Sequence, residues 1–269
     1  MFKRFKFLLT VLFSTLLTIS VMTACNANQN AGSGSGSRTV TMATSADYPP
    51  YEYVDSSSGS QEIIGFDVDI AKEITSRLGY DLQIQNIDFN GLVSALQTKR
   101  ADFVMAGMTP TPERKQSVDF SRIYYEAKNT IVARQGSNFR TTDALKGKTV
   151  AVQLGTIQEG VAKDLNEEKN LGLNIKPLNR INEIIQELKA GRIEAAIVED
   201  TVAKGYVESN PDLEFNTIPN AGEAGSAIAF PKGSELTAEF DRVLGEMIEN
   251  GKVEELVSKW FSTSVPAAK

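Results

Sequence analysis

The sequence predicts an α/β fold made of two successive series of alternating strands and helices. Short runs of β-branched and other apolar residues alternate with longer stretches in which apolar residues recur every three or four positions. This alternation starts at residue 39 and starts again near residue 130. Because strands that alternate with helices lie side by side, the pattern predicts parallel sheets covered by helices.

The first series holds three expected strands, "TVTMATS", "YDLQIQNI" and "ADFVMAG". Its expected helices are "GFDVDIAKEITSRLG", which ends at Gly79, and "FNGLVSALQTKR". The stretch "ADYPPYEYV", rich in Tyr and Pro, is typical of a loop, and "SSSGSQ" of a turn.

A third helix is expected after Thr111, which can act as its N-cap, with Pro112 at the first helical position. Arg114 then falls in the first turn and Lys115 follows it. The free N–H groups of a first turn already create a positive field, so a cation there costs roughly 0.3–1 kcal/mol. We therefore expect an anion to bind against this helix end.

The second series continues in the same way. Its expected strands are "KGKTVAVQL", "NIKPLN" and "IEAAIVE", and its helices lie in "GTIQEGVAKDLNEE", "INEIIQELKAGR" and "DTVAKGYVESNP". Two amphipathic helices are expected in "ELTAEFDRVLGEMIENGKVEELVSKWF".

Polar and aromatic residues gather in loops that follow the strands. Ligands of open parallel sheets bind where loops leave the carboxyl ends of the strands. The loops that qualify are "SADYPPYEY", "IDFNG", "GMTPTPER", "QLGTIQE" and "VEDT". We expect the binding site there.

The N-terminus predicts export. Residues 1–24 have a basic head and an apolar run softened by Thr and Ser, which is typical of a signal peptide and too short for a confident spanning helix. The run ends in "MTAC", which resembles a bacterial lipobox, so Cys25 is expected to carry a lipid anchor at the outer face of the cell membrane. An unmodified buried thiol is the alternative. Residues 25–38 predict a flexible tether.

The charge and the residue composition of the chain limit the functions that it can have. The 269 residues carry a net charge of −6, and loss of a basic signal peptide makes the charge more negative, which disfavours nucleic acid and favours cationic ligands. The chain has no His and a single Cys, so His-based acid–base chemistry and an internal disulfide are excluded. We expect no catalytic residues, no metal and no other cofactor.

The order of motifs resembles the extracellular substrate-binding proteins of polar amino-acid ABC importers, the group that binds lysine/arginine/ornithine, histidine or glutamine. The stretches that carry the resemblance are "DYPPYEYV", "IIGFDVDIAKEI", "DFNGLVSALQTKRADFVMAGMTPTPERKQSVDFS", "VAVQLGTIQE" and "EAAIVED". They cover nearly the whole chain after the tether, in the family's order.

This resemblance implies a periplasmic-binding-protein-like clamp of type II. Each lobe would hold a mixed, mostly parallel sheet flanked by helices, and two strands, "KNTIVAR" and "GSAIAFP", would form the hinge. Lobe 1 would comprise residues 39–127 plus 226–269, and lobe 2 residues 131–223. A hinge of two segments suits a bending closure around a ligand.

A free amino acid presents a carboxylate and an ammonium, and a buried cleft must neutralise both. The resemblance places the carboxylate on Arg114, whose guanidinium can donate two parallel hydrogen bonds. Thr109 precedes that turn, so its hydroxyl or N–H is expected to reach the same carboxylate, with a simple loop residue as its alternative. The alternative for Arg114 is a surface pair with Glu113 or Asp119.

The facing lobe is implied to share the same carboxylate. Thr156 and Ile157 open a helix with free N–H groups, and Gln158 can add a side-chain contact. A simple cap is the alternative for Thr156. Gln153 is expected to face the cleft.

Asp200 matches the family's acid for the α-ammonium, although it can also cap the helix that follows it. Glu199 is less typical of the family and is expected to face solvent. Gly107 matches a position where relatives often use Ser, so one hydroxyl is missing here. The backbone of Gly107 can still approach a ligand closely.

Tyr48 and Phe89 match two aromatic residues that sandwich the ligand's side chain, with the core as their alternative location. Stacking on a cationic side chain is worth roughly 0.5–2 kcal/mol per contact. Tyr51 and Tyr53 are expected to pack within the lobe.

Specificity is expected to depend on an acid in the first lobe. Relatives that take basic amino acids carry an Asp where this chain has Ser45. Glu52 is the first choice to replace that Asp, with Asp47 and Asp67 as further candidates.

The resemblance implies a receptor that captures a free L-amino acid, preferably arginine, lysine or histidine, and delivers it to the permease and ATPase of an importer. Glutamine or another polar amino acid is the alternative ligand. A secreted dehydratase on the same fold and a surface sensor without transport are the rival functions.

Overall fold

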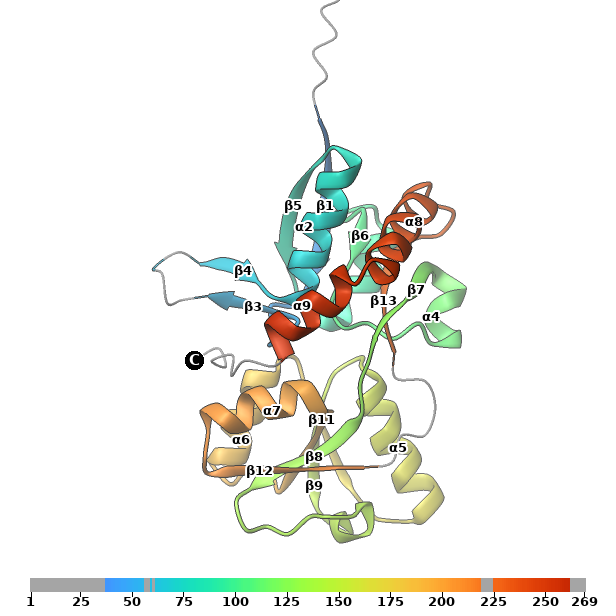
Figure 1. Cartoon of the computed structure of the whole chain (residues 1–269). Helices are drawn as coiled ribbons and strands as arrows, with labels where there is room; N and C mark the ends of the chain where they lie inside the picture. The colour runs from blue at the N-terminus through green and yellow to red at the C-terminus, as the bar shows by residue number, and fades with distance from the viewer. Residues whose placement is uncertain (1–36, 56–58, 60, 219–224, 262–269) are drawn as a thin grey trace, which may run out of the picture. The chain divides into compact units, whose positions relative to one another are not determined.

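The computed structural model describes residues 37–55, 59, 61–218 and 225–261 (Figure 1). The expected signal peptide, Cys25 and nearly all of the expected tether lie outside these residues. Among the described helices, none combines the length and the apolar character that a membrane span requires.

Two five-stranded sheets form the framework of the described chain. The first holds, in spatial order, β5 (Tyr80–Asn86), β1 (Arg38–Thr44), β6 (Phe103–Val104), β13 (Gly225–Pro231) and β7 (Val118–Glu126). The second holds β10 (Asn174–Leu178), β9 (Thr149–Gln153), β11 (Ala195–Glu199), β8 (Asn129–Arg134) and β12 (Leu213–Thr217).

The two sheets share one plan. In each, the first three strands pair in parallel, and the fourth strand pairs antiparallel with both of its neighbours. The antiparallel strand is β13 in the first sheet and β8 in the second. This arrangement confirms the expected α/β class with mixed, mostly parallel sheets.

Helices and short 3-10 turns connect the strands. Those that precede β7 along the chain are α2 (Phe66–Leu78), η1 (Phe89–Gly91), α3 (Leu92–Gln97) and α4 (Pro112–Ser117). The second sheet carries η2 (Thr142–Leu145), α5 (Ile157–Lys169), α6 (Ile181–Lys189) and α7 (Asp200–Ser209). The chain then ends its described part with α8 (Leu236–Glu249) and α9 (Lys252–Phe261).

Local signals account for the helix ends. Thr111 caps α4, because its side-chain oxygen accepts a hydrogen bond from the N–H of Arg114 at 3.2 Å, and Pro112 occupies the first helical position as expected. The helix α2 stops at Gly79, whose φ of 72° is accessible to glycine without steric cost. Both boundaries were predicted from the sequence.

The stretch "ADYPPYEYV" is not the simple loop that we expected. It contains β2 (Asp47–Tyr48) and β3 (Glu52–Asp55), which pair antiparallel with each other, and β3 pairs in turn with β4 (Glu62–Ile64). The third sheet that results is small, and it fixes the positions of acidic and aromatic side chains that a loop would leave free.

Two strands of the large sheets were missed, and one expected strand is shorter than its sequence stretch. The edge strands β7 and β12 carry polar residues without a clear alternation, so periodicity alone did not reveal them. Of "ADFVMAG", only Phe103 and Val104 pair as the strand β6.

The chain passes from the first sheet to the second through Ala127 and Lys128, between β7 and β8 (Figure 1). Apolar residues pack on both sheets. Leu92 and Leu96 of α3 pack with Val104 in one buried cluster, whereas Val150 and Ile197 lie in another on the second sheet. The loops at the strand ends are thereby held in place.

Candidate functional site

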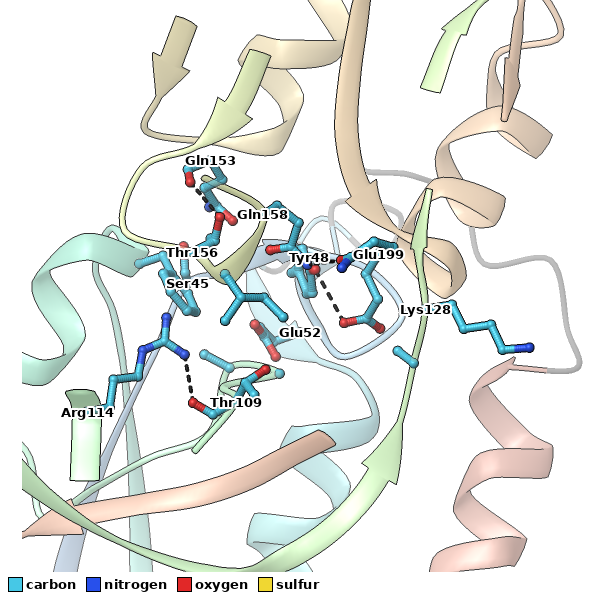
Figure 2. Close-up of a pocket in the computed structure, with 16 residues that line it drawn as sticks. Ser45, Tyr48, Glu52, Thr109, Arg114, Lys128, Gln153, Thr156, Gln158 and Glu199 are labelled. Carbon is cyan, nitrogen blue, oxygen red and sulfur yellow. Dashed lines mark hydrogen bonds between the residues drawn. The ribbon is translucent and has the colours of Figure 1, made fainter. Parts of the chain in front are cut away.

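A pocket lies where loops and strand ends of the two sheets meet, and Figure 2 shows the side chains that line it. Ten of the twelve residues expected at the site line this pocket: Tyr48, Glu52, Phe89, Gly107, Thr109, Arg114, Gln153, Thr156, Ile157 and Gln158. The other two, Asp67 and Asp200, do not line it. The further lining residues are Ser45, Ala106, Ala127, Lys128, Asn129 and Glu199.

Arg114 lies in the pocket without an acidic partner among the described residues. Its Nη1 donates a hydrogen bond to the backbone oxygen of Thr109 at 2.8 Å, and its Nη2 donates to the backbone oxygen of Gly155 at 2.9 Å. The guanidinium also lies over the ring of Phe89, 5.3 Å from its centroid. Burial lowers the pKa of Arg114 to about 10, so the side chain stays cationic at neutral pH.

The alternative partners expected for Arg114 are not used. Asp119 instead accepts from Lys232, with 2.7 Å between the carboxylate oxygen and Nζ. The guanidinium therefore keeps donor capacity for an anion that enters the pocket.

The turn at the start of α5 faces the same pocket. Thr156 caps this helix, because its Oγ1 accepts a hydrogen bond from the N–H of Glu159 at 3.4 Å while donating to the backbone oxygen of Gln153 at 2.7 Å. Thr156 therefore does act as a helix cap, which was the alternative to a role in ligand binding. It holds the N–H groups of the first turn of α5 at the pocket's edge.

Glu52 is the most unusual group of the pocket. It is fully buried, and neither of its carboxyl oxygens meets the geometry of a hydrogen bond with the described residues. Burial, followed by the nearby carboxyl of Asp67, raises the pKa of Glu52 well above its usual range. An unpaired buried carboxyl of this kind is costly unless it is protonated or a cation joins it.

Asp67 lies behind Glu52 rather than at the pocket surface. Its carboxyl accepts hydrogen bonds from the N–H of Gly107 at 2.9 Å and from the hydroxyl of Tyr124 at 2.8 and 2.9 Å. Burial raises the pKa of Asp67 to about 7, against these hydrogen bonds. Asp67 is therefore placed to act on Glu52, not on a ligand directly.

The acid that β11 brings to the pocket is Glu199, and the expectation that it faces solvent is wrong. Glu199 is only 6% exposed and accepts hydrogen bonds from the hydroxyls of Tyr51, at 2.5 Å, and Thr201, at 2.6 Å. Burial raises its pKa to about 7. Tyr51, expected only as packing, thus also contributes its hydroxyl to the site.

Asp200 turns away from the pocket because the chain changes there from strand to helix. It is the first residue of α7, and its Oδ1 accepts hydrogen bonds from the backbone N–H groups of Lys128 and Thr201 at 3.1 and 3.0 Å. Glu199 rather than Asp200 is the N-cap residue of this helix. The side chain of Asp200 therefore bridges two backbone segments.

The aromatic residues Tyr48 and Phe89 both line the pocket. Tyr48 stacks on Tyr51, with ring centroids 5.7 Å apart, and lies against Gly107. A Cβ atom added at Gly107 would lie 3.2 Å from Cε1 of Tyr48. The missing side chain at residue 107 thus leaves space for the tyrosine ring.

Two side chains of the second sheet complete the lining. Gln153 is buried, as expected from its place at the end of β9, and its Nε2 donates to the backbone oxygen of Asn179 at 3.1 Å. Gln158 donates from Nε2 to Oδ1 of Asn129 at 3.0 Å. Asn129 and Lys128 were not predicted to line the site, because no local sequence motif marks the start of β8 as part of a site.

Within the described residues, no group of three or more potential metal ligands is arranged to hold an ion. The pocket instead combines one guanidinium free of an acidic partner, two buried glutamate side chains, aromatic rings and a helix N-terminus. These groups can receive a small molecule that carries both negative and positive charges.

Comparison with known proteins agrees with this chemistry. The model of the bacterial extracellular solute-binding proteins, family 3, matches residues 40–263. The arginine-binding extracellular protein ArtP of Bacillus subtilis (strain 168) is 48% identical over 243 residues, which cover 90% of this chain and 92% of that protein.

Solved structures give the same result. The substrate-binding protein of an amino acid ABC transporter has a TM-score of 0.79 and 42% identity, covering 84% of this chain and 100% of its own. The arginine-, lysine-, histidine-binding protein ArtJ of Geobacillus stearothermophilus has a TM-score of 0.76 and 37% identity, covering 84% of this chain and 96% of its own. These likenesses confirm the expected two-lobed clamp of type II. Since the family model matches most of the sequence, this chain belongs to family 3 of the bacterial extracellular solute-binding proteins.

Proposed function

We propose that this chain is the extracellular receptor of an ABC importer and that it binds a basic L-amino acid, arginine foremost, in the pocket between the two sheets. The observation that carries the proposal is the presence in one pocket of a guanidinium without an acidic partner, Arg114, and a buried carboxyl without a cationic partner, Glu52, among the described residues. The names of the related proteins support this ligand, since ArtP is called arginine-binding and ArtJ is called arginine-, lysine- and histidine-binding.

The ligand's carboxylate binds Arg114. Thr109 and, from the other side of the pocket, the N–H of Ile157 at the start of α5 receive the same anion. The N–H of Thr156 itself donates to the backbone oxygen of Gln153 at 3.3 Å, so Thr156 positions this turn. Since a carboxylate can accept several hydrogen bonds, the guanidinium and the helix N-terminus share it without competition.

The two glutamates receive the positive groups. We assign the α-ammonium to Glu199 in place of Asp200, because Glu199 lines the pocket and Asp200 does not. Glu52 then takes the distal guanidinium or ammonium, with the rings of Tyr48 and Phe89 beside the ligand's side chain. Figure 2 shows Arg114 and Glu199 on opposite sides of the view, with the Glu52 carboxylate between them.

We assign lobe 1 to residues 39–127 plus 226–269 and lobe 2 to residues 131–223. The ligand contacts both lobes, so its binding favours the closed arrangement. The receptor performs no reaction itself; a permease and an ATPase use ATP to move the ligand.

We also propose that residues 1–24 are a signal peptide and that Cys25 carries a lipid. The chain would then lie on the extracellular face of the cell membrane, with residues 25–38 as tether. Mass spectrometry of the protein from its native membrane tests this assignment, because cleavage before Cys25 and diacylation give a defined mass.

A thermal-shift screen of the twenty amino acids, followed by calorimetry, tests the ligand. Arginine at about 100 times its dissociation constant should raise the Tm by roughly 5–10 °C. Glu52→Gln should weaken arginine more than glutamine, since only arginine presents a distal cation to that position. A screen in which glutamine alone raises the Tm would contradict the proposed ligand.

A further inference from the structure

Four carboxyl groups are buried around the pocket: Asp47, Glu52, Asp67 and Glu199. None of the four forms an ion pair within the described part of the chain. Their burial raises the pKa of each, to about 6 for Asp47 and about 7 for Asp67 and Glu199. Buried carboxylates without an ion pair repel one another, which favours protonation of the ligand-free pocket, although the positive charge of Arg180 offsets part of this effect for Asp47.

Glu52 and Asp67 differ in their hydrogen bonding. Asp67 accepts hydrogen bonds from Gly107 and Tyr124, which favour its ionised form. Glu52 has no donor within hydrogen-bond geometry among the described residues, although it lies close enough to Asp67 for each to affect the other's pKa. Adjacent carboxyl groups of this kind titrate as a pair and hold one proton between them, on the Glu52 side.

The titratable groups that lie close enough to affect the pKa of Glu52, or to have their own pKa affected by it, are acids and neutral hydroxyls. These groups are Asp47 and Tyr48 of β2, Asp67 of α2, Tyr124 of β7 and Glu199 of β11. Two cations line the same pocket, but neither neutralises Glu52. Arg114 donates to two backbone carbonyls, and Figure 2 shows the Lys128 side chain extending away from Glu52.

We propose that a basic amino acid binds with the release of a proton that Glu52 and Asp67 hold between them in the ligand-free protein. The inference rests on the proposed function. On binding, the O–H bond of the Glu52 carboxyl breaks, its proton passes to water or buffer, and the resulting carboxylate pairs with the ligand's distal cation. One positive charge replaces another, so the net charge of the pocket stays the same.

Proton release makes the affinity depend on pH. While the pair is protonated in the free protein and ionised in the complex, the affinity for arginine should rise by up to about tenfold per pH unit. Above the pKa of the free pair, the affinity should reach a plateau.

Calorimetry in two buffers measures the released proton. Arginine is titrated into the protein at pH 7 in phosphate and in Tris, whose heats of ionisation differ, and the difference in binding heat gives the number of protons. We expect a large fraction of one proton per arginine from the Glu52–Asp67 pair, with up to about half a proton more from Glu199, whose pKa is about 7. Equal heats in both buffers would overturn the inference and leave the proposed function intact, whereas no binding of arginine in either buffer would contradict the proposed function itself.

Two variants locate the source of the proton. Asp67→Asn keeps an oxygen that accepts from Gly107 and removes the charge that favours protonation of Glu52, so the number of protons released at pH 7 should fall by a large fraction of one. Tyr124→Phe removes a donor to the ionised Asp67, so the midpoint of the affinity profile should move to higher pH.

The midpoint of the affinity profile is expected to move to lower pH in Asp67→Asn and to higher pH in Tyr124→Phe. A general loss of folding would not produce opposite shifts. Circular dichroism checks that each variant is folded, and Tyr124→Phe alone decides if Asp67→Asn fails to fold. An unchanged proton number in folded Asp67→Asn, or an unchanged midpoint in Tyr124→Phe, would place the proton elsewhere and overturn the inference.

Discussion

The carboxyl group of Asp47 in β2 accepts a hydrogen bond from the backbone N–H of Ile181, the first residue of α6, at 2.6 Å. The backbone oxygen of Asp47 also accepts from the hydroxyl of Tyr206 in α7 at 2.9 Å. The small sheet that carries Glu52 is therefore joined directly to two helices of the second sheet. The bond from Ile181 uses an N–H that would otherwise be free at a helix end, where an acid is favoured.

The closed arrangement is expected to depend on this contact. Asp47→Ala removes a charge-assisted hydrogen bond worth roughly 1.5–3 kcal/mol, so the affinity for arginine should fall by roughly 10- to 150-fold. Small-angle scattering of the arginine-saturated variant should show a larger radius of gyration if the lobes close less completely.

Asp88→Ala is the matched control for Asp47→Ala. Asp88 pairs with Arg180 at 2.5 Å, next to Ile181, but both side chains are partly exposed. Exposed pairs of this kind contribute roughly 0–1 kcal/mol, so the affinity should change by no more than about fivefold. Equal losses of affinity in the two variants would show that the hydrogen bond from Ile181 to Asp47 does not stabilise the closed arrangement more than an exposed ion pair does.

Replacement of Arg114 by lysine should abolish most of the affinity, although the charge is kept. Lysine cannot present the two parallel N–H donors that grip a carboxylate, nor reach the carbonyls of Thr109 and Gly155 together. Loss of a buried, charged hydrogen-bonding partner costs roughly 2–5 kcal/mol, or about 30-fold at least. Calorimetry measures the effect, with exposed Lys115→Ala as the control that should bind normally. An affinity within threefold of the wild type would disprove the assigned role.

Gly107→Ser should reduce both stability and ligand affinity. The φ of residue 107 is 55°, which costs a side chain roughly 1–2 kcal/mol, and a Cβ there would also press on the ring of Tyr48. Gly136→Ser is the matched control, since its φ is 81° but no atom lies within 4 Å of the added Cβ. Both variants should lose roughly 2–8 °C in Tm, and only Gly107→Ser should bind arginine more weakly. Equal affinities of the two variants would show that the Tyr48 ring does not depend on this space.

Much of the site could be predicted because its signals are local. Thr111 and Thr156 each accept a hydrogen bond from the N–H three residues later. The helix caps that position Arg114 and the turn before α5 can therefore be recognised from four consecutive residues. The order of these local motifs along the chain was enough to give the fold class.

The errors concern side chains whose direction depends on distant parts of the chain. Glu199 and Asp200 are neighbours, and the antiparallel pairing of β11 with β8 decides which of them enters the pocket. Asp67 likewise owes its position to Tyr124, 57 residues away. Since neither strand pairing nor such contacts leave a local pattern, the sequence could suggest an acid for each role but could not choose it.

The stability of the ligand-free protein is expected to depend on pH. Burial raises the pKa of Asp47 to about 6, and that of Asp67 and Glu199 to about 7, whereas the unfolded chain has ordinary values near 4. Between about pH 4 and 7 the folded state thus binds more protons than the unfolded state. The free energy of unfolding must therefore fall as the pH rises through this window, by about 1.4 kcal/mol for each unit of pKa difference.

Scanning calorimetry at pH 5, 6.5 and 8 should show a Tm that decreases with rising pH, by roughly 15–30 °C in all. Below about pH 4 the trend reverses, because Asp119, whose pKa is lowered by its hydrogen bonds from Lys232 and Gly233, then loses its charge.

Asp67→Asn should flatten the decline in Tm between pH 5 and 8, because it removes one of the carboxyls that must ionise. Saturating arginine should flatten it too, because the ligand's positive groups stabilise the ionised Glu52 and Glu199. A Tm of the ligand-free protein that is constant or rises from pH 5 to 8 would mean that these carboxyls ionise as easily in the folded chain as in the unfolded one.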